Sequence, residues 1–105
     1  MKLKCCSNEK LLKDIGLAAD LLGIAAEENR LKILCVLKSG ERCVCDIWRD
    51  IGVTQNLASH HLKVLKGAGL IDSRKEGLKV IYRLNKEKLN KLNLLLNNLF
   101  QYGEK

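Results

Sequence analysis

Proline is absent from the sequence, and aromatic residues are few: one tryptophan, two tyrosines and one phenylalanine among 105 residues. With no proline and only eight glycines, the composition gives no case for a disordered or fibrous chain. The apolar fraction of 47% is normal for a globular protein. A length of 105 residues suits one domain, so we expect a single compact core.

Long apolar runs are absent as well. No stretch approaches the roughly 18 apolar residues of a membrane-spanning helix, so we expect no membrane partner. The basic start of the chain is followed by the polar residues 7–10 rather than by an apolar run, so we also expect no secretory signal. Together these absences predict a cytoplasmic protein.

Residues with the chemistry of an active site are scarce. The sequence has two histidines, no glycine-rich phosphate loop and no acidic cluster. No histidine and acid accompany a cysteine in the pattern of a nucleophilic enzyme. We therefore expect that the chain is not an enzyme.

Charge points to a different kind of function. The formal net charge is +7 and the sequence pI is near 9.3, which favours an acidic partner, with nucleic acid ahead of membrane. Five cysteines are an odd number, and in a reducing compartment they argue against a disulfide framework. Metal, redox and packing roles stay open for them, except that Cys35 lies among apolar helix positions and is expected to be a small core residue.

Apolar residues recur at helical spacing through the first two thirds of the chain and predict four helices. We expect them at residues 8–22, 27–38, 43–50 and 54–68. Gly52 suits the reversal after the third helix, and Thr54 is a good N-cap for the fourth. A short helix, a tight turn and a longer helix form the helix-turn-helix pattern.

The last third of the chain predicts two strands and a helix. Residues 70–74 and 79–84 flank the turn 75–78 and form a hairpin with a basic tip, the wing. Asn85 can cap a final helix that has more leucines than a small monomer needs to cover its core. The expected fold is therefore mainly α with a small β-hairpin, a winged helix-turn-helix in the order α-α-α-α-β-β-α.

The expected fourth helix separates apolar from polar side chains. Its apolar side is formed by Leu57, Ala58, Leu62, Leu65 and Ala68. Its other side has residue types that bond base edges or phosphates, and the first part of such a helix enters a major groove. The expected DNA-reading residues are Gln55, Asn56, Ser59, His60 and Lys63.

Two further predictions follow from this arrangement. His61 falls on the inner side of the helix, so we expect a hydrogen-bonded core histidine and not a metal ligand. Arg74, Lys75 and Lys79 on the wing are expected to bind phosphates or reach the minor groove, which fixes register without reading much sequence.

Three segments form a specific pattern: Glu41-Arg42-Cys43-Val44-Cys45-Asp46-Ile47, Ala58-Ser59-His60-His61-Leu62 and Arg74-Lys75-Glu76-Gly77. Together they resemble the ArsR/SmtB family of metal-responsive winged-helix repressors, over roughly residues 10–100. The resemblance implies that apo protein binds operator DNA and that metal releases it. It also implies a homodimer built from the first and last helices, with Leu11, Leu12, Ile15, Leu92, Leu96 and Leu99 at the interface.

Within the family, the likeness is closest to the cadmium/lead-responsive and arsenic-responsive repressors, which both use the cysteines matching Cys43 and Cys45. The cadmium/lead type adds cysteines from a flexible N-terminal arm of the other subunit. Cys5 and Cys6 lie in such an arm here, residues 1–8, ahead of a DNA-binding and dimerisation domain at 9–102. Trp48 stands where the arsenic type has a third cysteine. The last helix lacks the histidines of the family's zinc site, so we expect no zinc there.

Thiolate ligation selects soft ions such as Cd(II), Pb(II), Zn(II) or trivalent arsenic and antimony. On a regular helix, Cys43 and Cys45 would point about 200° apart, so one ion needs the first turn to be distorted or already unwound. The helix start and Arg42 are expected to favour the thiolate. Our hypothesis is a soft-metal site of Cys43 and Cys45 with Cys5 and/or Cys6 of the other protomer. A redox- or persulfide-sensing repressor of the same fold is the alternative.

Overall fold

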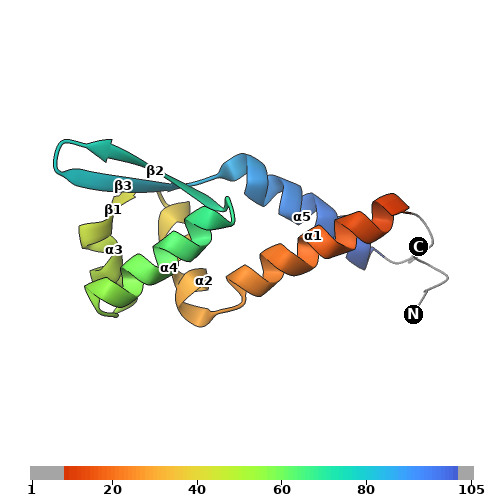
Figure 1. The fold of residues 1–105 in the computed structure, drawn as a ribbon, viewed down its shortest axis with the longest axis horizontal. Coiled ribbons are helices and arrows are strands. Elements are labelled where there is room, and N and C mark those ends of the chain that lie inside the picture. Colours follow the sequence, from red (N-terminus) through yellow and green to blue (C-terminus); the bar gives the residue numbers. More distant parts are fainter. Residues whose placement is uncertain (1–8, 102–105) are drawn as a thin grey trace.

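The computed structural model describes residues 9–101 of the chain (Figure 1). The elements in chain order are α1 (Glu9–Ala25), α2 (Glu28–Lys38), β1 (Arg42–Cys43), α3 (Val44–Ile51), α4 (Gln55–Gly67), β2 (Ile71–Glu76), β3 (Lys79–Leu84) and α5 (Lys86–Phe100). The expected winged helix-turn-helix is confirmed, with α3 and α4 as the helix pair and β2 and β3 as the wing.

Helix ends follow the capping residues of the sequence. Thr54 accepts a hydrogen bond from the Leu57 N–H at 3.1 Å, and Asn85 accepts one from the Lys88 N–H at 3.1 Å. Gly52 has a φ of +74° and ends α3 in the left-handed conformation that allows the tight turn into α4. These caps fix where the helix-turn-helix begins and ends.

The first helix is longer than the sequence predicted. It continues through Gly23 to Ala25 instead of ending near Leu22. A glycine inside a helix costs only about 1 kcal/mol relative to alanine. Ala25 is buried at the helix end, so its packing outweighs that local cost.

The sheet has three strands in the order β1-β3-β2, all antiparallel neighbours. The two-residue strand β1 was not predicted, because such a short segment has no alternation to detect; it exists by pairing with β3. The wing strand β2 continues to Glu76, two residues beyond the predicted end, because Glu76 still pairs with Lys79. Gly77 then makes the turn with a φ of +65°.

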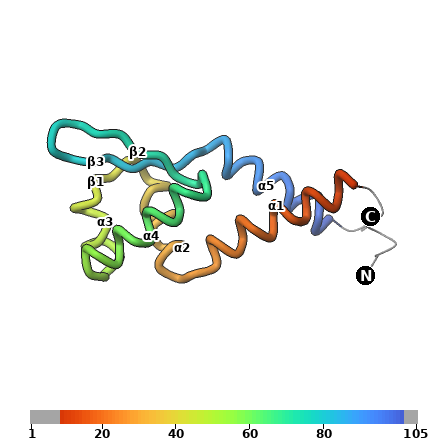
Figure 2. Tube along the Cα trace, viewed as in Figure 1, coloured from red at the N-terminus to blue at the C-terminus, as the bar shows by residue number. Residues whose placement is uncertain are grey.

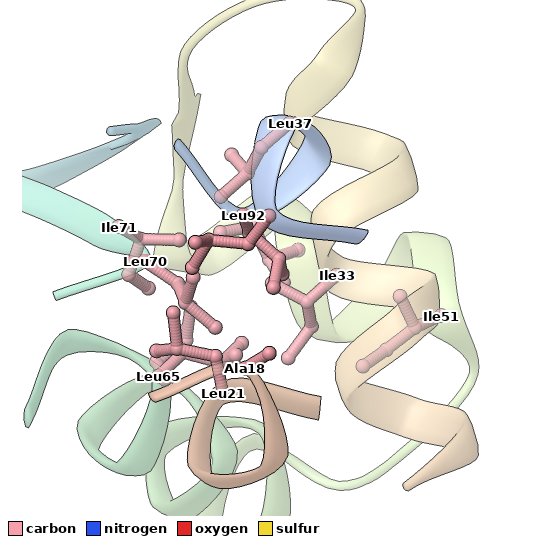
Figure 3. Packing of buried hydrophobic residues seen from close by; sticks show 12 residues of the cluster. Ala18, Leu21, Ile33, Leu37, Ile51, Leu65, Leu70, Ile71 and Leu92 are labelled. Carbon is pink, nitrogen blue, oxygen red and sulfur yellow. The ribbon is translucent and has the colours of Figure 1, made fainter. Parts of the chain in front are cut away.

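The core lies where α2, α3, α4 and the start of β2 meet, closed by α1 and α5 (Figure 3). Its fully buried large side chains are Ile33, Ile47, Leu62, Leu65, Leu70 and Ile71. Because these residues come from α2, from the helix-turn-helix and from the start of the wing, the hydrophobic core itself fixes the reading helix relative to the hairpin.

Two residues predicted to be in the core are exposed. Cys35 lies two positions from each of the buried residues Ile33 and Leu37, which turns it to the opposite side of α2. Leu57 is 40% exposed, because its neighbour Ala58 takes the buried position on α4. Both predictions were wrong because several faces of these helices contain apolar residues.

Helices α1 and α5 pack against each other and extend away from the rest of the molecule, at the end opposite the hairpin tip (Figures 1 and 2). This pair therefore leaves an apolar surface that the single chain does not cover. In the part of the chain that the structure describes, no helix is long and apolar enough to cross a membrane.

Candidate functional site

The expected reading residues lie together on the exposed side of α4. Gln55, Asn56, Ser59, His60 and Lys63 are all exposed, while Ala58, Leu62 and Leu65 on the other side are buried. The structure thus presents a polar surface along α4 from Gln55 to Lys63. Such a surface can reach base edges in a major groove.

His61 is buried, 5% exposed, and hydrogen bonded as predicted. The Arg30 Nε donates to its Nδ1 at 3.2 Å, and the Arg30 Nη1 donates to the Ile24 carbonyl at 3.2 Å. Glu27 accepts from the Arg30 backbone N–H at 3.0 Å, and its Oε1 lies 3.8 Å from the His61 Nε2. The group of Arg30, His61 and Glu27 joins the reading helix to the α1–α2 junction. Sequence reasoning missed Arg30 and Glu27, because a contact across 31 residues leaves no local pattern.

The wing exposes Arg74, Lys75 and Lys79, as predicted. A hydrogen bond of 2.7 Å from the Lys66 Nζ to the Ser73 Oγ ties α4 to β2. The reading helix and the wing are therefore joined by a polar contact as well as by the core.

Arg74 is engaged by two carboxylates within the chain. Its Nη2 lies 2.9 Å from the Glu41 Oε1 and 3.1 Å from the Glu76 Oε2. The hydrogen bond from Arg74 holds the pKa of the Glu41 carboxyl below its ordinary range, and the bonds to Glu41 and Glu76 raise the pKa of Arg74. Sequence reasoning did not identify Glu41, which comes close to the wing through strand pairing.

The structure joins the Cys43 and Cys45 sulfurs in a disulfide, with the two Cα atoms 5.2 Å apart. Cys43 is the N-cap of α3, with an extended backbone at φ −72° and ψ 148°, and its sulfur accepts from the Cys45 N–H at 3.2 Å. The expected divergence of about 200° applies to two residues inside one helix. Cys43 lies outside the helix, which begins at Val44, so the structure has the second of the two expected cases, a helix start that is already unwound at Cys43.

The side chains around Cys43 and Cys45 are charged. The Arg42 Nε lies 3.9 Å from the Asp50 Oδ2, so a carboxylate shares the charge of Arg42, and its effect on the thiolates stays a prediction. Within residues 9–101, no group of three or more Cys, His, Asp or Glu side chains could hold a metal ion. Cys5 and Cys6 lie outside the described residues. When their disulfide is reduced, Cys43 and Cys45 supply two soft donors, which suit one side of a thiolate site.

Five of the six residues expected at a dimer interface border the exposed surface of α1 and α5. Leu12 is 50% exposed, and Leu11, Ile15, Leu96 and Leu99 are half-buried. Leu92 differs, because it is buried in the chain's own core and is not available to a partner. Between the two helices lies an apolar groove of about 440 Å³, lined by Leu11, Ile15, Leu22, Leu96, Leu99 and Phe100 among others.

Comparison with known sequences identifies relatives among bacterial regulators. The family described as "Bacterial regulatory protein, arsR family" matches residues 27–73. An arsenical resistance operon repressor of Staphylococcus xylosus is 38% identical over 73 residues, which cover 70% of each chain. A cadmium resistance transcriptional regulatory protein CadC homolog of Staphylococcus aureus is 43% identical over 68 residues, 64% of this chain and 56% of that relative. The chain thus spans a little over half the length of this second relative.

Solved structures of similar fold include reduced HlyU from Vibrio cholerae, at a TM-score of 0.74 and 32% identity, covering 90% of this chain and 100% of that one. A possible transcriptional regulator for arsenical resistance matches at a TM-score of 0.72 and 34% identity, covering 79% of this chain and 86% of that one. These matches confirm the family resemblance and the winged fold. Since the relatives are transcriptional regulators, they also confirm that the chain is not an enzyme.

Proposed function

The chain belongs to the ArsR/SmtB family of winged-helix transcriptional repressors, and on that premise we propose that it is a cytoplasmic sensor of soft metals or metalloids. It binds operator DNA as a homodimer and is released when its thiolates bind Cd(II), Pb(II), Zn(II), As(III) or Sb(III). The observation that carries this proposal is the convergence of the Cys43 and Cys45 sulfurs at the start of α3, the helix that precedes the reading helix.

The proposed effector site consists of Cys43 and Cys45 from one protomer with Cys5 and/or Cys6 from the arm of the other. Thiolates select soft ions over magnesium and calcium. An arm of residues 1–8 spans up to roughly 28 Å when extended, enough to reach a partner. The names of the two relatives, arsenical resistance and cadmium resistance, support an effector of this class.

The proposed DNA contacts follow from exposure and charge. Gln55, Asn56, Ser59, His60 and Lys63 read the major groove from the exposed side of α4. Arg74, Lys75 and Lys79 bind phosphates or reach the minor groove from the wing. The net charge of +7 favours association with the DNA backbone.

The proposed homodimer covers the surface of α1 and α5. Phe100, at the end of α5, is 72% exposed and lines the apolar groove between the helices, and Leu94 on the same helix is 61% exposed. A second copy of the chain supplies the same surface and can cover it around a twofold axis. This pairing also places two reading helices on one DNA duplex.

Thiolate-to-metal charge-transfer absorption tests the effector site. We expect Cd(II) or As(III) to produce the absorption in the wild-type protein and the Cys43→Ser and Cys45→Ser variants to lose most of it. Cys35→Ser is the matched control, because Cys35 is an exposed cysteine on α2. Unchanged spectra in both the Cys43 and Cys45 variants would rule out the proposed site.

A redox sensor of the same fold is the second candidate, and the direct pairing of the Cys43 and Cys45 sulfurs favours it. Two thiols that lose two protons and two electrons to an oxidant form a disulfide and leave no thiolates for a metal. Mass spectrometry separates the candidates. A redox sensor loses two hydrogen atoms after mild oxidant and then changes its DNA affinity, whereas a metal sensor changes DNA affinity while its thiols stay reduced.

A further inference from the structure

The thiol pair and the wing are parts of one sheet. Cys43 pairs with Ile81 on one side of β3, and Arg74 pairs with Ile81 on the other side. Residues directly opposite each other on neighbouring strands point to the same face. Cys43 and Arg74 are therefore two strand spacings apart, roughly 10 Å, on the same face of the sheet.

That face continues on both sides of this pairing. Glu76 stands two residues from Arg74 on β2, so the alternation of side chains along a strand places both on the same face. Glu41 comes directly before β1, two residues from Cys43. Both carboxylates reach the guanidinium of Arg74, Glu41 at 2.9 Å and Glu76 at 3.1 Å. A hollow of about 560 Å³ lies over this face, lined by Glu41, Cys43, Glu76 and Lys79 among others.

The two carboxylates lie on different segments of the chain. Glu76 lies on the same strand as Arg74 and moves with the wing. Glu41 precedes Cys43 on the segment that enters β1, a strand of only two residues. The Glu41 contact therefore joins the wing to the thiol pair, and the Glu76 contact does not.

A phosphate must compete with these carboxylates for Arg74. Guanidinium groups bind carboxylate and phosphate in the same forked geometry, so an arginine whose donors face a carboxylate is less available to DNA. The side chains of Arg74 and Glu41 are 45% and 43% exposed, which leaves the pair open to exchange with a phosphate.

We propose that Glu41 is a regulatory competitor for the wing arginine: it occupies Arg74 in the DNA-free chain and yields to a phosphate when DNA binds. An ion that joins the Cys43 and Cys45 sulfurs ties β1 to the start of α3, holds Glu41 opposite Arg74 in the sheet, and so raises the cost of DNA binding. This inference rests on the proposed metal-sensing function and deepens it. The wing is then a route by which an ion at the thiol site weakens DNA binding.

The test uses three full-length proteins, the wild type and the variants Glu41→Gln and Glu76→Gln. The probe is a fluorescent duplex that the wild-type protein has selected from a random-sequence pool. Its affinity is measured by anisotropy with and without Cd(II). Each variant removes one negative charge that faces Arg74, so both are expected to tighten metal-free binding, by about two- to fivefold for an exposed pair.

The response to Cd(II) separates the two variants. We expect Glu41→Gln to reduce the Cd(II)-induced loss of DNA affinity by about two- to fivefold, and Glu76→Gln to keep the wild-type loss. By linkage, the DNA-induced loss of Cd(II) affinity, measured from charge-transfer absorption, must shrink by the same factor in Glu41→Gln. An equal response of the two variants, or a wild-type response in Glu41→Gln, would overturn the inference and leave the proposed function standing. Where Cd(II) leaves the DNA affinity of the wild-type protein unchanged, the same comparison is made with Pb(II), Zn(II), As(III) and Sb(III). A wild-type protein whose DNA affinity ignores all of these ions would overturn both.

Discussion

Replacing Arg30 by methionine tests how the reading helix is held in place. Methionine keeps an unbranched apolar side chain and removes the guanidinium. The substitution leaves the Nδ1 of the buried His61 without its donor and also removes the bond to the Ile24 carbonyl at the end of α1. The first loss costs about 1–3 kcal/mol and the second about 1 kcal/mol. We therefore expect the free energy of unfolding to fall by roughly 2–4 kcal/mol.

Thermal unfolding followed by circular dichroism measures this change at a fixed protein concentration, because dimerisation makes the midpoint depend on concentration. For a domain of this size, the midpoint is expected to fall by roughly 8 °C or more. The double variant Arg30→Met with His61→Leu removes both partners, so it is expected to cost less than the sum of the two single variants. Additive effects, or an unchanged midpoint in Arg30→Met, would refute the role assigned to this contact.

Three further predictions concern the wing and the dimer. Lys75→Ala is expected to weaken binding to all DNA sequences alike and to lower the slope of log Kd against log salt concentration by about 0.9. An effect confined to one operator would contradict a phosphate contact. Leu12→Glu places a charge on the exposed apolar surface of α1, so sedimentation is expected to show at least about tenfold weaker dimerisation without loss of helix content, and a stable dimer would refute this interface. Gly77→Val forces a β-branched residue to a φ of +65°, at a cost of about 1–2 kcal/mol, so amide exchange at the hairpin tip is expected to accelerate, and unchanged exchange would contradict the turn.

Much of the fold could be predicted because the capping residues and the spacing of apolar residues indicated the same helices. Thr54 and Asn85 mark helix starts through their own side chains, and Gly52 marks a helix end through its left-handed backbone. The reading side of α4 followed from helical phase, since Ala58, Leu62 and Leu65 point inward as expected. Signals of this kind lie within a few residues and need no knowledge of the rest of the chain.

The errors came from interactions between distant segments. Strand β1 forms because Arg42 and Cys43 pair with β3, and this pairing takes Cys43 out of the helix and turns it toward Cys45. A reading of residues 43–50 as one regular helix therefore gave a divergence that the structure does not have, and the expected alternative, a helix start already unwound at Cys43, is the one observed. Glu41 reaches Arg74 through the same sheet. Both features depend on β3, about 40 residues further along the chain, and no local pattern contains that information.

The central claim is that the thiol pair controls DNA binding. The most direct measurement titrates Cd(II) and As(III) into preformed complexes of the selected duplex with the reduced wild-type protein and with the Cys43→Ser and Cys45→Ser variants. We predict that at least one ion releases the wild-type protein, with a loss of affinity of about a hundredfold, or about 2.7 kcal/mol, and that both variants stay bound. Release of both variants at the same ion concentration as the wild type, or retention of the wild type with every ion, would contradict the claim.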